Sequence, residues 1–150
     1  MARFNYRMQS VLNIKQKTEG QVKMEFASAQ SELNRQLDIL DEYIKRKENY
    51  LLEAEILRNE ESLKLQDILD NQYATAQMDV MIASQAKVVK EYEKKVDRVR
   101  VRLTRAIQER KMQETLRDRA YAEYLEEEKQ EEAKENDQRT SFTYGQRGDR

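Results

Sequence analysis

The chain contains no proline and only three glycines, Gly20, Gly145 and Gly148, in 150 residues. Proteins use these two residue types for tight turns, and an average composition would supply roughly seven prolines. A fold with many strands and loops is therefore nearly excluded. The residues that take their place, above all Glu, Lys, Gln, Leu, Arg and Ala, are strong helix formers. The sequence predicts long, uninterrupted helices.

The composition argues against a globular core. Charged and apolar residues each make up 38% of the chain, whereas globular proteins have roughly 25% and about 45–50%. The 28 basic and 29 acidic residues leave a net charge of −1, which gives no general attraction to nucleic acid or membranes. The longest apolar run is Val80 to Ala83, and the first residues lack the apolar stretch of a signal peptide. We expect a cytoplasmic chain that does not insert into a membrane.

The residue types that most enzymes use are also missing. The absence of cysteine and histidine removes thiolate nucleophiles, the usual general base and the commonest metal ligands. The scattered glycines form no phosphate-binding loop, and carboxylate-bridged metal sites in helical bundles normally include histidine. The sequence therefore predicts a non-enzymatic protein with no cofactor and no metal.

Two apolar stripes predict how the helices pack. The first runs from Phe4 to Leu51 and averages 3.62 residues over 13 steps, close to the period of a straight helix. Its members are Phe4, Met8, Val11, Lys15, Thr18, Val22, Phe26, Ala29, Leu33, Leu37, Leu40, Ile44, Lys47 and Leu51. The second, from Val89 to Tyr124, averages 3.5. Two helices with one narrow seam each bury those seams most economically against each other. We predict an all-α fold, a long antiparallel two-helix coiled-coil hairpin with no globular core.

The turn between the helices has two candidate positions. At residues 59–62, Asn59 can adopt the left-handed conformation after a helix and Ser62 can cap the next one. At residues 70–75, Asn71 and Thr75 could take the same roles. The first position is preferred, because it leaves the acidic C-terminal part of the second helix as an overhang.

This turn sets the expected boundaries. It pairs Phe4 with about residue 116 of the second helix. The hairpin would cover residues 1–139, with helix one at about 3–58, the turn at about 59–62 and helix two at about 63–138. The last residues, 140–150, contain two glycines and no periodicity, so they are predicted to be a disordered tail. Gly20 should weaken the first helix by about 1 kcal/mol relative to alanine. It is either a tolerated weak spot, or a point of close approach by a partner or a local bend.

Two segments carry a strong local charge. Between Lys87 and Lys111 there are ten basic and four acidic residues, and Glu123 to Asp137 holds eight acidic and two basic residues. Because Arg98, Arg100 and Arg102 are spaced by two, they fan around the helix. The basic segment is best interpreted as a solvated face, with an acidic protein partner or nucleic acid as alternatives. The acidic segment is either a solvated face or a surface that docks on a basic partner.

The N-terminal residues carry a more specific signal. The segment from residue 4 to residue 15 reads FNYRMQSVLNIK and is followed by Glu19. It resembles the start of the flagellar export protein FliJ family, which has an aromatic pair, a Leu-Gln or Met-Gln step, two apolar residues, Asp or Asn, an aliphatic and a basic residue. The stretch Glu109-Arg110-Lys111, with Glu114, Leu116 and Arg119, is similar to the Glu-Arg-Lys-x-x-Glu-x-Leu-x-x-Arg pattern of that family. The resemblance covers nearly the whole chain. It departs at Glu135-Asn136-Asp137, where the family commonly has an apolar-Asp-Glu step.

This resemblance implies a non-enzymatic component of the flagellar type III protein export apparatus. Such proteins form an antiparallel hairpin similar to the central stalk of rotary ATP synthases. The end with both termini enters the hexameric export ATPase, FliI, and promotes ring assembly and hydrolysis. A second implied partner is the cytoplasmic domain of the export gate protein, FlhA, and some members also escort export chaperones. The implied location is cytoplasmic, peripheral at the inner face of the cell membrane, with no nucleic acid partner.

The resemblance also implies which residues bind these partners. The ATPase-binding end would comprise Phe4, Tyr6, Met8, Val11, Leu12, Ile14, Arg110, Glu114 and Arg117. The export-gate-binding residues would be Gln36, Leu40, Tyr43 and Tyr73. Where a further aromatic is expected, the chain has Lys47, with Tyr50 a turn later. The alternative function is a purely structural coiled-coil tether without an ATPase partner.

Overall fold

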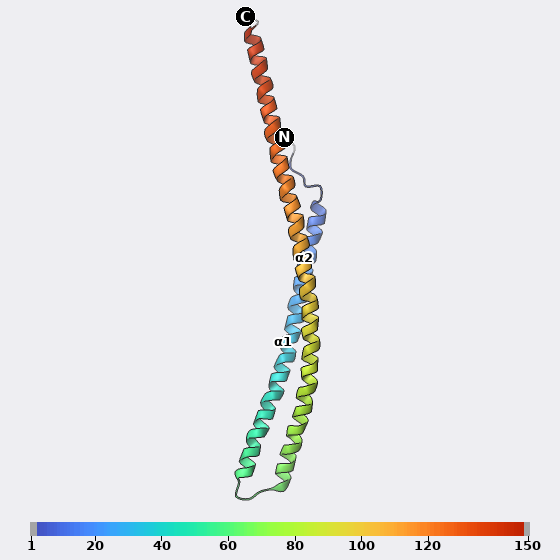
Figure 1. Ribbon diagram of the computed structural model, residues 1–150, viewed down its shortest axis with the longest axis vertical. Coiled ribbons are helices and arrows are strands. Elements are labelled where there is room, and N and C mark those ends of the chain that lie inside the picture. The colour runs from blue at the N-terminus through green and yellow to red at the C-terminus, as the bar shows by residue number, and fades with distance from the viewer. Residues whose placement is uncertain (1–2, 149–150) are drawn as a thin grey trace. The chain divides into compact units, whose positions relative to one another are not determined.

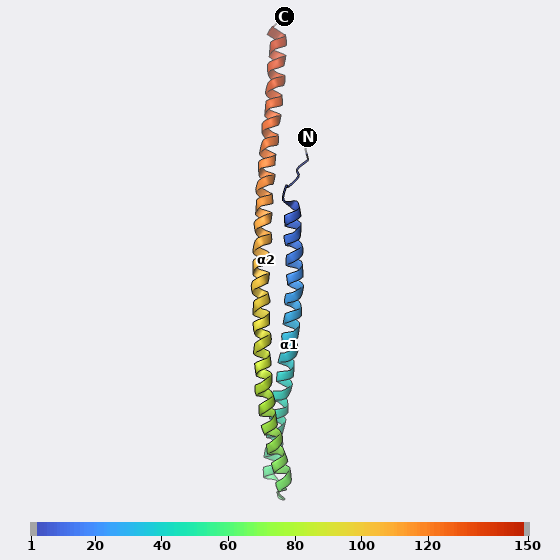
Figure 2. The same cartoon turned by 90° about the vertical axis from the view of Figure 1, so that its right-hand side faces the viewer.

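The computed structural model describes residues 3–148 and contains two long helices there (Figure 1). Helix α1 covers Gln9–Asn59 and helix α2 covers Leu65–Gly148. The helices run antiparallel, as two perpendicular views show (Figures 1 and 2), and the described residues include no strand. The predicted all-α antiparallel hairpin is therefore confirmed.

The chain divides into two compact units. The hairpin unit contains residues 21–104, and the terminal unit contains residues 3–20 together with 105–148 of the described chain. In the hairpin unit, buried apolar residues from both helices form one narrow core. Its members are Val22, Ala29 and Leu33 from α1 and Val89, Val96 and Val99 from α2, with Phe26, Leu40, Tyr92 and Leu103 packed against them.

The buried stripe of α1 follows a strict heptad in the hairpin unit. From Val22 to Leu57 one stripe of buried and half-buried positions advances by alternating steps of four and three, which gives 3.5 residues per step; Gln30, Glu32 and Ile39 are half-buried beside it. They are Val22, Phe26, Ala29, Leu33, Gln36, Leu40, Tyr43, Lys47, Tyr50, Ala54 and Leu57. The predicted period of 3.62 is wrong here, and Ile44 is 39% exposed. Side chains with long apolar stems, such as Tyr43 and Lys47, can pack in a two-helix seam while their polar ends reach its edge.

The connection between the helices occupies residues 60–64. Asn59 is the last residue of α1, and no described non-glycine residue has a positive φ. The expected left-handed conformation of Asn59 is therefore wrong. Ser62 is not the cap of α2 either, since that helix begins at Leu65. Arg58 in the last turn of α1 and Asp67 in the first turn of α2 favour these helix ends through the helix dipole.

The alternative turn at residues 70–75 lies inside α2. There Asn71 is buried, and its Nδ2 donates a hydrogen bond of 2.9 Å to the backbone carbonyl of Tyr50 on α1. The Thr75 hydroxyl donates to the Asn71 carbonyl at 3.0 Å, one helical turn earlier. The Asn71 side chain therefore links α2 to α1, and the Thr75 side chain bonds within α2. Neither of them ends the helix.

The outer helix ends differ from the expected boundaries. Helix α1 begins at Gln9 rather than near residue 3, after a short non-helical segment. Helix α2 continues through the expected disordered segment to Gly148; residues 149 and 150 lie outside the described part of the chain. Without proline nothing forces the helix to stop. A Cβ added at Gly20 would meet nothing within 4 Å, so Gly20 is not a point of close approach within the chain.

Candidate functional site

An aromatic cluster fixes the N-terminal segment of the terminal unit. The Phe4 ring lies 5.1 Å from the Tyr121 ring in an edge-on arrangement and 5.3 Å from the Tyr124 ring. The Tyr6 hydroxyl donates to Oε1 of Gln113 at 3.4 Å. Phe4 was expected near residue 116. It lies further along α2 because residues 3–8 are not helical, and a non-helical chain advances more per residue than the 1.5 Å of a helix.

Ion pairs between α1 and α2 hold the same unit together. The Glu19 carboxylate is only 6% exposed and accepts two hydrogen bonds from the Arg110 guanidinium, which also donates to Glu114 at 2.9 Å. These hydrogen bonds, that to Glu19 first, raise the pKa of Arg110 further above its ordinary value. Lys15 and Glu109 form a second pair at 3.0 Å. The side chains of Arg110 and Glu114 are therefore held in place before any partner binds.

The expected ATPase-binding residues fall into two groups. Leu12 is 2% exposed and belongs to the seam, and Val11 is half-buried. By contrast, Ile14 is 62% exposed, and Met8 and Arg117 are also exposed. The first group supports the terminal unit, whereas the second is available to another molecule.

Three of the four expected gate-binding residues lie on the seam of the hairpin unit. Gln36 accepts hydrogen bonds from Nε2 of Gln85 through its backbone carbonyl, at 3.0 Å, and its side-chain oxygen, at 2.9 Å. Leu40 packs against the core, and Tyr43 is half-buried. The structure thus brings these three side chains onto one stripe of α1. Tyr73 is different, because it is 68% exposed on α2.

The acidic side chains and the apolar stretches of the two helices bear on metal binding and on membrane spanning. Among residues 3–148, no three acidic side chains come close enough together to hold a metal ion. Over the same residues, neither helix has a stretch apolar enough to cross a bilayer.

One family model, described as Flagellar FliJ protein, matches residues 4–149. The chain belongs to the FliJ family. The match covers almost all of the sequence and confirms the resemblance seen at the N-terminus. Comparisons with curated proteins and with solved structures found no match. As a FliJ-family member, the chain is a component of the flagellar export apparatus, and the family is in general non-enzymatic.

Sequence reasoning missed several residues that shape the terminal unit of this FliJ-family chain. Tyr121 and Tyr124 form the surface on which Phe4 packs. Tyr124 belonged to the predicted second stripe, and the spacing of three places Tyr121 on the same face. Glu19 was noted only for the family pattern, because the predicted stripe passes through Thr18, whereas the structure exposes Thr18 and buries Glu19 against Arg110. That pairing depends on the register between the helices.

Proposed function

We propose that this FliJ-family chain is a stalk-like adaptor that performs no chemistry of its own. Its terminal unit would bind the hexameric export ATPase FliI and promote assembly and hydrolysis. Its hairpin unit would bind the cytoplasmic domain of the export gate protein FlhA. Through these partners the chain would lie peripherally at the inner face of the cell membrane.

The observation that carries the ATPase proposal is the contrast within the terminal unit. Ile14, Met8 and Arg117 are exposed, while the neighbouring aromatic cluster and the Glu19–Arg110 pair hold the two helices in one register. The residues that contribute most to binding at protein interfaces are often apolar or arginine side chains held on a part of the molecule that is already ordered. The exposed side chains of the terminal unit have these properties. Binding would therefore order little of this unit.

The test mixes the purified chain with its cognate export ATPase and measures ATPase oligomerisation and hydrolysis. Wild type should stimulate both. Ile14→Ala combined with Met8→Ala should reduce the stimulation without reducing helix content. The matched control is Val101→Ala, which removes an equally exposed aliphatic side chain from the hairpin unit. If wild type changes neither readout, the proposal is wrong and a purely structural tether becomes the better account.

Tyr73 offers the sharpest test of gate binding. A tyrosine that keeps about two thirds of its surface exposed on a helix is an anchor that a partner can bury. Tyr73→Ala should weaken binding to the FlhA cytoplasmic domain, measured by calorimetry. Tyr144→Ala is the control, because Tyr144 is equally exposed but lies in the terminal unit. Equal losses in the two variants would contradict the assignment of the gate to the hairpin unit.

A further inference from the structure

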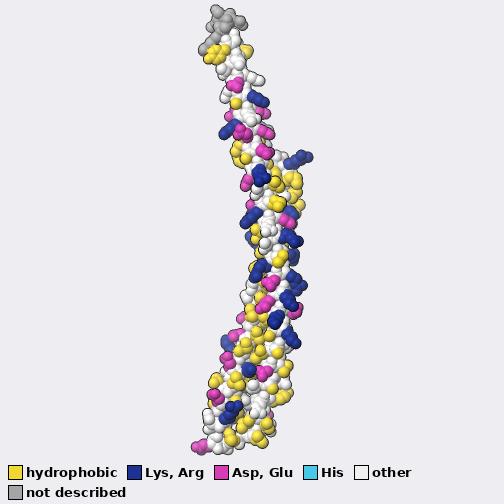
Figure 3. Space-filling view, viewed as in Figure 1, with side chains coloured by type: hydrophobic (Ala, Val, Ile, Leu, Met, Phe, Trp, Pro, Cys, Tyr) yellow, Lys and Arg dark blue, Asp and Glu magenta, His cyan; other side chains and the backbone are white. Residues whose placement is uncertain are grey.

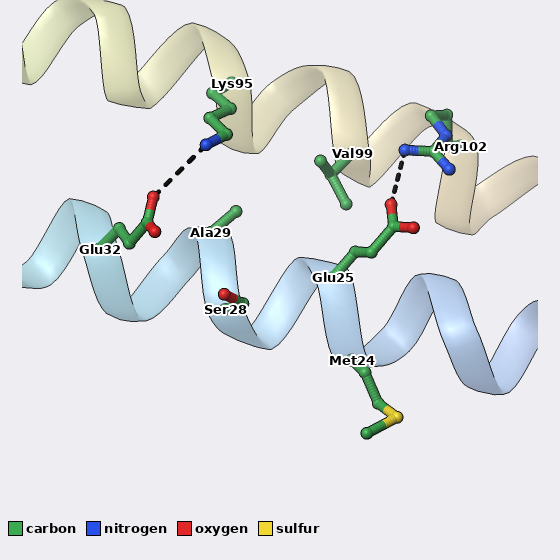
Figure 4. A pocket seen from close by; sticks show the side chains of 8 residues that line it. All are labelled: Met24, Glu25, Ser28, Ala29, Glu32, Lys95, Val99 and Arg102. Atoms are coloured by element: carbon green, nitrogen blue, oxygen red, sulfur yellow. Dashed lines mark hydrogen bonds and ion pairs between the residues drawn. The ribbon is translucent and has the colours of Figure 1, made fainter.

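The hairpin unit has an open groove between its helices. The groove has a volume of about 480 Å³, and its floor includes the small side chain of Ala29 and that of Val99 (Figure 4). Two ion pairs bridge it, Arg102 to Glu25 at 2.6 Å and Lys95 to Glu32 at 3.4 Å, drawn as dashed lines in Figure 4. Glu25 and Glu32 are both on α1. The α1 edge of the groove is therefore acidic and the α2 edge is basic.

The α2 edge extends into a longer stripe. Steps of three and four along α2 place five residues on one flank, namely Val88, Glu91, Lys95, Arg98 and Arg102. Lys95 and Arg102 keep half of their side-chain surface exposed despite their ion pairs. Arg98 is exposed, and its Nε donates only to a backbone carbonyl, that of Lys94 at 3.4 Å. The three cations can thus each accept a further carboxylate.

The C-terminal part of α2 carries a second stripe of mostly charged side chains, of which Glu128 accepts a hydrogen bond from Tyr124 on the same helix. Steps of four and three give Glu128, Glu132, Glu135, Arg139 and Phe142 on one face. Phe142 is 68% exposed, so this highly charged part of α2 presents a large apolar side chain to solvent. Acidic side chains crowd this part of α2 in the space-filling view (Figure 3). An acidic helix that ends in an exposed aromatic is suited to a basic surface with an apolar end.

The two stripes match each other in reverse order. Aligned antiparallel, Glu128 meets Arg102, Glu132 meets Arg98, Glu135 meets Lys95, Arg139 meets Glu91, and Phe142 meets Val88. The spacings agree at every step, because four-three-four-three read backwards is three-four-three-four. In all four charged pairs a base faces an acid. In three of them the acid is on the C-terminal stripe, and in the fourth, Arg139 with Glu91, the acid is on the basic flank. Such a match gives an interface both register and orientation.

We propose that the C-terminal segment of one copy docks antiparallel along this flank of α2 in a second copy. The contact is between molecules because α2 is unbroken from Leu65 to Gly148, and two segments of one continuous helix cannot pack against each other. The proposal does not depend on binding to the ATPase or the gate. It gives a role in self-association to Lys95, Arg98 and Arg102 of the basic segment and to the acidic segment, none of which the proposed function uses.

The experiment measures self-association by sedimentation equilibrium at low and high salt. Wild type should associate, more weakly as salt increases. Arg98→Glu and Glu132→Arg should each weaken association by at least about tenfold, since each places like charges together. Neither substitution touches an ion pair between α1 and α2. The double variant Arg98→Glu/Glu132→Arg restores opposite charges and should regain association.

The controls are Lys90→Glu and Glu126→Arg, exposed charge reversals that lie off the two stripes. They change the net charge by the same amounts and should leave association close to wild type. A wild-type protein that stays monomeric at low salt would overturn the proposal. So would single variants that associate normally, or a double variant that is no better than the singles.

Discussion

Replacing Leu12 by alanine tests whether the seam of the terminal unit is placed correctly. Leu12 is 2% exposed, so the substitution removes buried carbon from the contact between α1 and α2. Burial of each carbon contributes about 0.8 kcal/mol, which gives about 2.4 kcal/mol for the three carbons lost. A two-helix seam is open to water at its edges, so little is added for an empty cavity. We expect Leu12→Ala to lower the free energy of unfolding by about 2–3 kcal/mol.

The assay is urea unfolding followed by helical circular dichroism. With a denaturant slope of about 2 kcal/mol per molar, the midpoint should fall by about 1 M. Ile14→Ala is the matched variant, because Ile14 lies two residues away and is 62% exposed. The carbon it loses is mostly solvated and alanine favours helix, so its free energy of unfolding should stay within about 0.5 kcal/mol of the wild-type value. If Ile14→Ala were the more damaging variant, the orientation of α1 in the terminal unit would be wrong.

Three further outcomes follow from single side chains. Gly20→Ala should stabilise the chain by about 0.5–1 kcal/mol in urea unfolding, because a helical glycine is unfavourable and the new Cβ has open space; destabilisation would mean that the site is crowded. Asn71→Ala should cost about 1–2 kcal/mol in the same assay, because the hydrogen bond to the Tyr50 carbonyl is lost; no loss would argue against a buried Asn71. Burial, followed by the charge of Glu128, raises the pKa of the Tyr124 phenol above its ordinary value. Its stabilising contribution is therefore complete below the ordinary tyrosine pKa and lost as pH rises through the higher folded value. Spectroscopic titration should show this late ionisation, and Glu128→Gln should move it to lower pH.

The basic segment shows what the spacing along one helix leaves open. Arg98, Arg100 and Arg102 fan around a helix, and the basic segment was therefore interpreted as a solvated face. The structure shows Lys95 and Arg102 on one edge of a groove, and Arg98 completes a stripe with them. The sequence contains this stripe, but many other stripes can be drawn through ten basic residues. The packing of α1 shows which stripe borders the groove, because Glu25 and Glu32 of α1 pair with Arg102 and Lys95.

The seam illustrates the same limit. The sequence correctly placed Val22, Phe26 and Ala29 on the buried stripe, but it then continued through Leu37 and Ile44 because they are apolar. The structure instead buries Gln36 and Tyr43 in part. A polar residue is shielded when a partner across the seam can bond it, as Gln85 does for Gln36. No periodicity in one helix reveals that partner.

The sequence by itself determined the helices, the hairpin and the family. Each depends on local information, since the absence of proline, the helix-forming composition and the N-terminal pattern need no knowledge of what lies across the seam. Only the tertiary structure decided which residues are shielded, where Phe4 packs and that Glu19 pairs with Arg110. These depend on the register between two helices, which is set by the sum of many weak contacts between residues far apart in the chain. A shift of one turn would change every pair and leave both helices intact.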